Sequence, residues 1–233
     1  MLLALSYYSN ALLESTKLDA IISKLLLMGG PQRSSLTIEA LSGKIQQYRI
    51  LVQYESVDKT PFETNQEMLD LIKERLEILE QCRQISVDRR TGAISLHPDV
   101  SSLKGFSLLR LLDGLLGHVF DTYLIACLAL QEVSQGNLVI KESRLVSELH
   151  TATQRMYDER IVPQLVSCLR DTFRTAIHRM ADLGMATVNI YQTEEKESIS
   201  YISSSFDSLP KLKEATLLFI EAQGYSDQDI ARL

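Results

Sequence analysis

The stretch FSLLRLLDGLLGHVFDTYLIACLALQEV, residues Phe106 to Val133, is the segment around which the fold is expected to form. Its apolar residues recur at steps of three and four positions, which is the period of an α-helix. A helix with so little polar surface is usually covered on most sides, so we expect a central core helix over residues 106–133. The polar positions fall on one narrow stripe: Arg110, Asp113, Gly117 and Asp121. The apolar positions are Leu108, Leu111, Leu112, Leu115, Leu116, Val119, Tyr123, Cys127 and Leu130.

The core helix is not expected to cross a membrane. Its longest uncharged run, from Thr122 to Gln131, is half of the roughly 20 residues that a bilayer requires. The opening residues, MLLALSYYSNALL, are apolar but lack the basic region and the cleavage site of a signal peptide. They are expected to belong to a helix that begins before this chain does.

The composition narrows the function classes. With 233 residues, of which 45% are hydrophobic, the chain can bury a sizeable core. The net charge of -6 argues against a nucleic-acid surface, because phosphate binding needs a clustered positive field. The three cysteines, Cys82, Cys127 and Cys168, lie far apart within helical patterns, so neither a disulfide framework nor a metal site is indicated, and no cofactor is expected.

Two segments change from the helical period to strict alternation, which is typical of strands. Ile85 to Val87 and Ile94 to Leu96 alternate around a loop that contains Gly92, so we expect a β-hairpin over 85–97. A second hairpin is expected over 187–202, around the acidic tip Glu194 to Glu197. Helices are expected before and after each hairpin. Apolar residues at helical spacing indicate three of them: Leu36, Ile38, Leu41, Ile45, Tyr48 and Val52; then Leu138, Leu145, Leu149, Thr153 and Met156; then Leu165, Leu169, Phe173, Ile177 and Met180. Capping residues indicate helix ends: the capping box Thr64 to Glu67, Gly184 as a C-terminal cap, and Ser208 as the N-cap of the last helix.

The expected fold is therefore mainly α: a helical bundle with two short β-hairpins. Each half of the chain shows three helices followed by a hairpin. We expect a first helical unit over 1–100, with the hairpin 85–97, and a second over 101–233. The second unit contains the core helix 106–133, the hairpin 187–202 and a C-terminal helix.

Helices followed by a two-stranded wing resemble winged-helix units in tandem. Such units often bind DNA through their third helix. Here the third helix, from Thr64 to Gln84, carries five acidic and three basic residues, and its field would repel phosphate. We expect no nucleic-acid partner.

The four histidines offer no complete active site. His118 and Asp121 are three positions apart on one helix, so they could form an acid–base pair or simply a satisfied polar spot in a helix interface. His178 and Asp182 are four apart, which suggests a pair on a helix surface. The chain contains no G-x-S-x-G, no H-E-x-x-H and no glycine-rich phosphate loop.

Arginines make the segment that ends near Gly184 locally basic. Arg170 and Arg174 are one helical turn apart, and such a face could contact anionic lipid headgroups or ligand phosphates. Solvated arginines that flank a core helix are the simpler interpretation.

Short motifs in order along the chain point to a family. The C-terminal region of glycerol-3-phosphate and dihydroxyacetone-phosphate acyltransferases has a tyrosine-asparagine helix. This helix is similar to the segment Tyr7-Tyr8-Ser9-Asn10-Ala11-Leu12-Leu13. Leu115-Leu116-Gly117 with Asp121 and Tyr123 is similar to a core helix of that region. Arg155, Leu183-Gly184 and Ser203-Ser204-Ser205-Phe206 follow in the same succession.

The resemblance implies a parent enzyme that makes lysophosphatidate from acyl-CoA and glycerol 3-phosphate. Enzymes of this family use a His-x-x-x-x-Asp motif, whose histidine deprotonates the attacking hydroxyl. None of the four histidines here has aspartate five positions later, so no catalytic residue carries over. Whether the chain is itself an enzyme stays open. The resemblance implies packing against the catalytic domain through Tyr7, Tyr8, Asn10 and Tyr123, and an anionic-surface contact is assigned to Arg170 and Arg174.

We therefore expect a helical C-terminal domain that supports an acyltransferase domain absent from this chain, in phospholipid synthesis. Its partners would be that domain and a membrane surface. The expected location is membrane-associated: the mitochondrial outer membrane, endoplasmic reticulum or peroxisome in a eukaryote. One alternative is a tandem winged-helix-like adaptor for protein partners without enzymatic activity, and another is a small helical enzyme that uses His118 and Asp121.

Overall fold

The computed structural model describes residues 16–28, 36–51, 65–101, 107–163, 169–192, 197–225 and 229. The chain divides into two compact units, residues 1–116 and 117–233, each of which is described by itself. The sequence pattern placed this division after residue 100. The expected capping residue Thr64 and the apolar marks Val52 and Leu165 lie outside the described residues.

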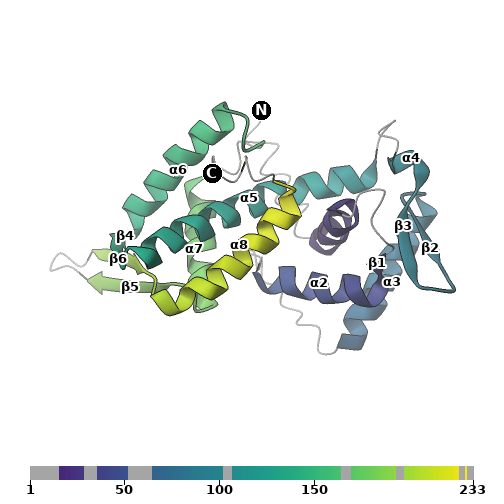
Figure 1. Ribbon diagram of the computed structural model, residues 1–233, viewed down its shortest axis with the longest axis horizontal. Helices are drawn as coiled ribbons and strands as arrows, with labels where there is room; N and C mark the ends of the chain where they lie inside the picture. Colours follow the sequence, from purple (N-terminus) through teal and green to yellow (C-terminus); the bar gives the residue numbers. More distant parts are fainter. Residues whose placement is uncertain are drawn as a thin grey trace. The chain divides into compact units, whose positions relative to one another are not determined.

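The first unit begins with a helix over 16–28 and continues through a short strand, two helices and a hairpin (Figure 1). Its elements are β1 (Leu36–Thr37), α2 (Ile38–Leu51), α3 (Asn65–Gln81), β2 (Ile85–Asp88), β3 (Ala93–Leu96) and α4 (Pro98–Ser101), followed by the start of α5 (Leu108–Gln135). The expected hairpin is confirmed, and Pro98 opens a short helix directly after it. The expected second helix starts later than Leu36, because that residue lies in β1.

The sheet of the first unit is antiparallel, with β3 between β1 and β2. Ile94 of β3 is opposite Val87 of β2 and Leu36 of β1. Ile85 and Ile94 are buried while Ser86 and Ser95 are exposed, as the alternation in the sequence predicted. The hydroxyl of Thr37 accepts the N–H of Ala40 at 3.3 Å, so β1 leads directly into a capped helix.

The second unit repeats this order of elements: helix, short strand, two helices and two strands. After α5 come β4 (Val139–Lys141), α6 (Glu142–Asp158), α7 (Arg170–Asp182), β5 (Thr187–Gln192) and β6 (Ser198–Ser203). The sheet order is β4-β6-β5, which matches β1-β3-β2, and all pairs are antiparallel. The chain then forms the 3₁₀ turn η2 (Phe206–Ser208) and α8 (Leu209–Gln223). The mainly helical fold with two hairpins is confirmed, while the likeness to winged helices stays a prediction.

Helix α5 forms the core of the second unit. Every residue from Gly117 to Cys127 is buried. Of the stripe that the sequence pattern treated as polar, Gly117 and Asp121 are therefore buried, whereas Asp113 is half-buried and Arg110 is exposed. Helix α8 covers one side of α5 (Figure 1). The ring of Phe219 is fully buried, with its centroid 5.7 Å from that of Phe120 and 5.8 Å from that of Tyr123.

Further hydrogen bonds join α8 and its lead-in to α5. Gln131 donates to the hydroxyl of Thr216 at 2.6 Å, and the hydroxyl of Ser134 donates to the carbonyl of Ser205 at 2.6 Å. Ser208 does not cap α8 with its side chain, contrary to the expectation. Its backbone is already in the α region, because η2 precedes the helix, and its hydroxyl lies 3.1 Å from that of Ser205 instead.

By length and composition, α5 could cross a bilayer, with a mean hydropathy of 1.4 over its most apolar 18-residue window. Of that window, 72% is buried inside the protein. The core helix of a soluble protein passes the same test, so this is weak support for a membrane span.

Replacing Phe219 with alanine should lower the free energy of unfolding by about 3–5 kcal/mol, because the ring leaves a cavity against Phe120 and Tyr123. Chemical denaturation monitored by circular dichroism measures this change. Leu217→Ala on the same helix is the matched control: Leu217 is 66% exposed, and its loss should cost no more than about 0.5 kcal/mol. Equal effects of the two changes would contradict the packing described here.

Candidate functional site

A buried carboxylate lies in the middle of α5. Asp121 has no exposed surface, and its Oδ1 atom accepts a hydrogen bond from the hydroxyl of Tyr225 at 2.7 Å and another from the side-chain amide of Gln223. The same amide donates to the carbonyl of Gly117 at 2.8 Å. Gly224, at φ 69°, ends α8 and lets the chain turn so that Tyr225 reaches Asp121.

Tyr225 keeps its proton under ordinary conditions. Burial raises the pKa of its phenol, and the negative charge of Asp121 raises it further. A phenol in this state donates a hydrogen bond to Asp121 but is a poor acid near neutral pH. The cluster of Asp121, Gln223 and Tyr225 is therefore suited to hold the end of α8 against α5.

His118 does not form an open reactive centre with Asp121. Only 2% of His118 is exposed and none of Asp121, so neither offers a surface on which a substrate could lie. The hydrogen bonds of Asp121 to Gln223 and Tyr225 give its carboxylate a structural role. The geometry favours the polar spot in a helix interface over the acid–base pair.

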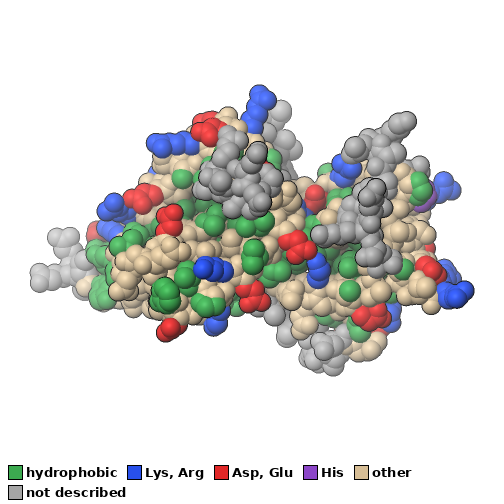
Figure 2. All heavy atoms as spheres, in the orientation of Figure 1, with side chains coloured by type: hydrophobic (Ala, Val, Ile, Leu, Met, Phe, Trp, Pro, Cys, Tyr) green, Lys and Arg blue, Asp and Glu red, His purple; other side chains and the backbone are tan. Residues whose placement is uncertain are grey.

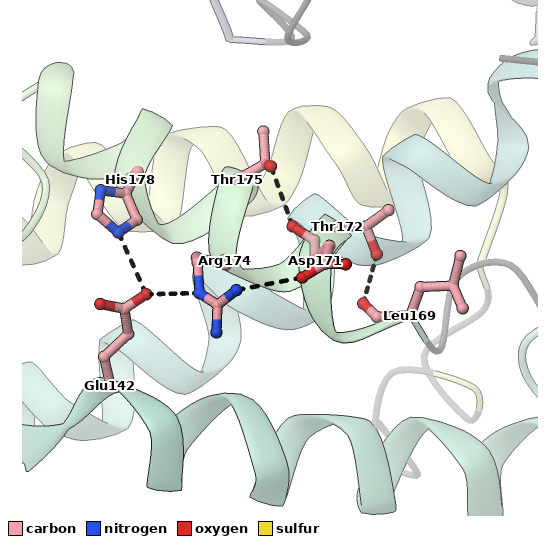
Figure 3. Close-up of polar contacts among 7 residues, drawn as sticks. All are labelled: Glu142, Leu169, Asp171, Thr172, Arg174, Thr175 and His178. Atoms are coloured by element: carbon pink, nitrogen blue, oxygen red, sulfur yellow. Dashed lines mark hydrogen bonds and ion pairs between the residues drawn. The ribbon is translucent and has the colours of Figure 1, made fainter.

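A second polar cluster joins α6 to α7 (Figure 3). Glu142 is the first residue of α6, and its side chain is only 9% exposed. Its Oε1 atom accepts a hydrogen bond from Nε of Arg174 at 3.0 Å and lies 3.2 Å from Nε2 of His178. Arg174 also donates through Nη1 to Asp171 at 3.1 Å. Arg174 and His178 are one turn apart on α7, so both reach the same carboxylate.

This cluster changes the expected environment of two site residues. His178 contacts Glu142 on another helix, in place of the expected contact with Asp182 one turn away on its own helix. Both arginines are exposed, and Arg174 forms ion pairs with the carboxylates of Glu142 and Asp171. The role of Arg170 and Arg174 at an anionic surface stays a prediction.

The residues predicted to pack against another domain are only partly described. Tyr7, Tyr8 and Asn10 lie outside the described residues. Tyr123 is 1% exposed and packs against Phe219 within the second unit. Its contact with a further domain stays a prediction.

The first unit also buries charge. Lys24 is 8% exposed, and its ammonium lies 3.0 Å from Oδ1 of Asp113. Nε of Arg75 lies 3.6 Å from Asp19. Burial raises the pKa of Asp19, and the charge of Arg75 partly offsets this effect. The buried Lys24 and the half-buried Arg75 each face an opposite charge, which is the arrangement expected of structural pairs.

No metal-binding group is found among the described residues: no three histidine, cysteine, aspartate or glutamate side chains converge there. Burial raises the pKa of the Cys127 thiol to about 12, so it is a poor nucleophile. Cys82 is exposed at the end of α3.

Comparison with known proteins supplies the family. The family model of the glycerol-3-phosphate acyltransferase C-terminal region matches residues 2–189. The chain belongs to this family. Membership suggests association with a membrane at the family level. The match covers the motifs quoted from Tyr7 to Leu183-Gly184, and it ends within β5.

One curated protein is also similar. A DNA polymerase I of Borreliella burgdorferi is 25% identical to the chain over 212 residues, which cover 84% of this chain and 23% of that protein. The chain thus spans about a quarter of the length of this relative. Such a likeness does not establish a shared activity.

Replacing Glu142 with glutamine should lower the free energy of unfolding by about 1–3 kcal/mol, because the charge between Arg174 and His178 is lost. Thermal and denaturant unfolding at neutral pH measure the change. Asp171→Asn is the control, since this second partner of Arg174 is 90% exposed and its removal should have little effect. A larger effect of the control would show that the buried contact is not the important one.

Replacing Tyr225 with phenylalanine should cost about 1–3 kcal/mol near neutral pH, because Asp121 loses a hydrogen-bond donor. The difference from the wild type should shrink as the pH rises above about 10, the ordinary pKa of tyrosine. Above that pH the unfolded phenol ionises while the folded one keeps its proton, so the wild type loses a contribution that the variant never had. Denaturation curves from pH 7 to about 11 test this, with Tyr191→Phe as an exposed control. A difference that stays constant with pH would contradict the assignment.

Proposed function

We propose that this chain is a structural domain that supports the catalytic domain of a glycerol-3-phosphate acyltransferase. In the supported reaction, a hydroxyl of glycerol 3-phosphate attacks the thioester of an acyl-CoA. The new ester is lysophosphatidate, and CoA leaves as the thiol. This chain would bind and stabilise the domain that carries out that step.

The observation that carries the proposal is the family match over residues 2–189 in a chain that lacks the catalytic motif. The positions five residues after His97, His118, His150 and His178 hold serine, tyrosine, arginine and leucine. A histidine base without its aspartate lacks the group that orients it.

The polar contacts support a structural role. Asp121 binds the end of α8, and Glu142 binds Arg174 and His178 of α7. Both carboxylates are buried, and each joins its own helix to another element of the second unit. Side chains used in this way hold helices in place, which supports a structural role for the chain.

A second candidate is an adaptor that binds protein partners without taking part in acyl transfer. The observation in its favour is the repeated order of elements, in which each unit has a three-stranded sheet of the same strand order. An autonomous adaptor would have no reason to bind an acyltransferase domain.

The test uses the purified chain and a separately produced acyltransferase domain of a glycerol-3-phosphate acyltransferase from the same source. Alone, the chain should form no lysophosphatidate from labelled acyl-CoA and glycerol 3-phosphate. Mixed with the catalytic domain, it should co-purify on size-exclusion chromatography and raise the melting temperature of that domain by mass action.

Turnover by the chain alone would overturn the structural role, and His118→Ala would then identify or exclude His118 as its base. A lack of complex formation would favour the adaptor. Fluorescence anisotropy with labelled duplex DNA measures DNA binding, which neither the structural domain nor the protein adaptor should show. Because the net charge is -6 and α3 is acidic, we expect no binding at about 0.15 M salt.

A further inference from the structure

The loop of the first hairpin presents two arginines to solvent. Asp88 of β2 is opposite Ala93 of β3, so residues 89–92 form the connection. Arg89 and Arg90 are both exposed. Figure 2 shows Lys and Arg side chains, in blue, at the end of this hairpin. We call residues 88–92 the basic tip.

The shape of the basic tip is fixed without help from the arginine side chains. The carboxylate of Asp88 accepts the N–H of Arg90 at 2.9 Å and the hydroxyl of Thr91 at 2.7 Å. The N–H of Gly92 donates to the carbonyl of Asp88 at 2.7 Å, and Gly92 closes the turn at φ 69°. These hydrogen bonds lower the pKa of Asp88, so its carboxylate stays ionised and bound to the turn.

Both guanidinium groups are free to bind a ligand within the part of the chain that the structure describes. No ion pair or hydrogen bond of either side chain to a described residue is found there. The nearby carboxylates already have donors: Asp88 holds the loop, and Glu80 accepts the N–H of Val87 at 3.1 Å. Arginine presents a planar fork of donors that matches the oxygens of a phosphate.

We propose that the basic tip binds the phosphate groups of anionic phospholipids at a membrane surface. The inference rests on the proposed function, because a domain that supports a membrane-associated acyltransferase works beside such a surface. Each arginine close to an anionic bilayer strengthens binding by about fivefold, so the pair supplies about 25-fold. Because the turn is already ordered, little of this gain is lost in fixing the backbone.

The charges elsewhere favour a lipid surface over a nucleic acid. A duplex that tracked along the first unit would meet α3, whose exposed residues include Glu67, Asp70, Glu74 and Glu77. The projecting end of a hairpin can touch a flat surface without bringing a helix face to it. The tip sequence of the second hairpin is acidic, Glu194-Glu195-Lys196-Glu197, so only the first hairpin has the charge for this contact.

Flotation of the whole chain with lipid vesicles tests the proposal at about 0.15 M salt. The wild type should float with vesicles made of phosphatidylcholine and phosphatidylserine in a two-to-one mixture, and should not float with pure phosphatidylcholine. The variant Arg89→Gln/Arg90→Gln should partition into the mixed vesicles about 25-fold less. The control Arg110→Gln/Arg155→Gln removes two exposed arginines elsewhere and should partition like the wild type.

The proposal would be overturned by equal partitioning of the tip variant and the wild type, by equal loss in the control, or by no flotation of the wild type. Inorganic phosphate at millimolar concentration should not release the chain from vesicles, since release would point to a soluble phosphate ligand. Tighter binding to duplex DNA than to vesicles, lost in the tip variant, would assign the tip to nucleic acid.

The catalytic domain is absent from this assay, so its result is separate from that of the proposed function. The tip variant should still co-purify with the acyltransferase domain. Loss of flotation with complex formation intact supports the basic tip. If flotation depends on the tip but the chain forms no complex with the acyltransferase domain, the lipid contact is supported and the proposed structural role is contradicted.

Discussion

The buried charge of Asp121 is the constraint on which the second unit depends. A carboxylate with no exposed surface must accept hydrogen bonds from donors inside the protein, because burying a charged carboxylate without such donors strongly destabilises the folded state. Here the donors include Gln223 and Tyr225, which lie at the end of α8, about a hundred residues further along the chain. The carboxylate of α5 therefore fixes the position of the C-terminal end of α8. Aromatic packing of Phe219 on Phe120 and Tyr123 then adds the apolar part of the same contact.

The sequence predicted those parts of the fold that depend on short-range pattern. The period of the core helix and the alternation around Ile85 and Ile94 extend over enough residues to be recognised, so the core helix and both hairpins are confirmed. Strands β1 and β4 have only two and three residues, which is too short for alternation to be seen. Their residues therefore looked like the first turns of the helices that follow. Strands β1 and β4 are defined only by their pairing with β3 and β6, which come much later in the sequence.

The candidate site was harder to predict for a related reason. Arg174 and His178 are one turn apart, and the sequence shows this, but it does not show that Glu142 lies opposite them, 32 and 36 positions earlier. Asp121 was paired with His118 by spacing alone, whereas its hydrogen bonds to Gln223 and Tyr225 come from the other end of the unit. Spacing along one helix identifies which side chains share a face. It does not identify the partner that crosses from another helix.

The match to the family stops at residue 189, inside β5, and this position has a practical consequence. A polypeptide terminated there would keep half of an outer strand and lose β6, the middle strand of its sheet. It would also lose the helix that shields Phe120 and Tyr123 from water. Such a truncated product should aggregate and be poorly soluble, even though it contains every residue that the family model matches. The stretch that sequence comparison recognises is thus shorter than the stretch that folds.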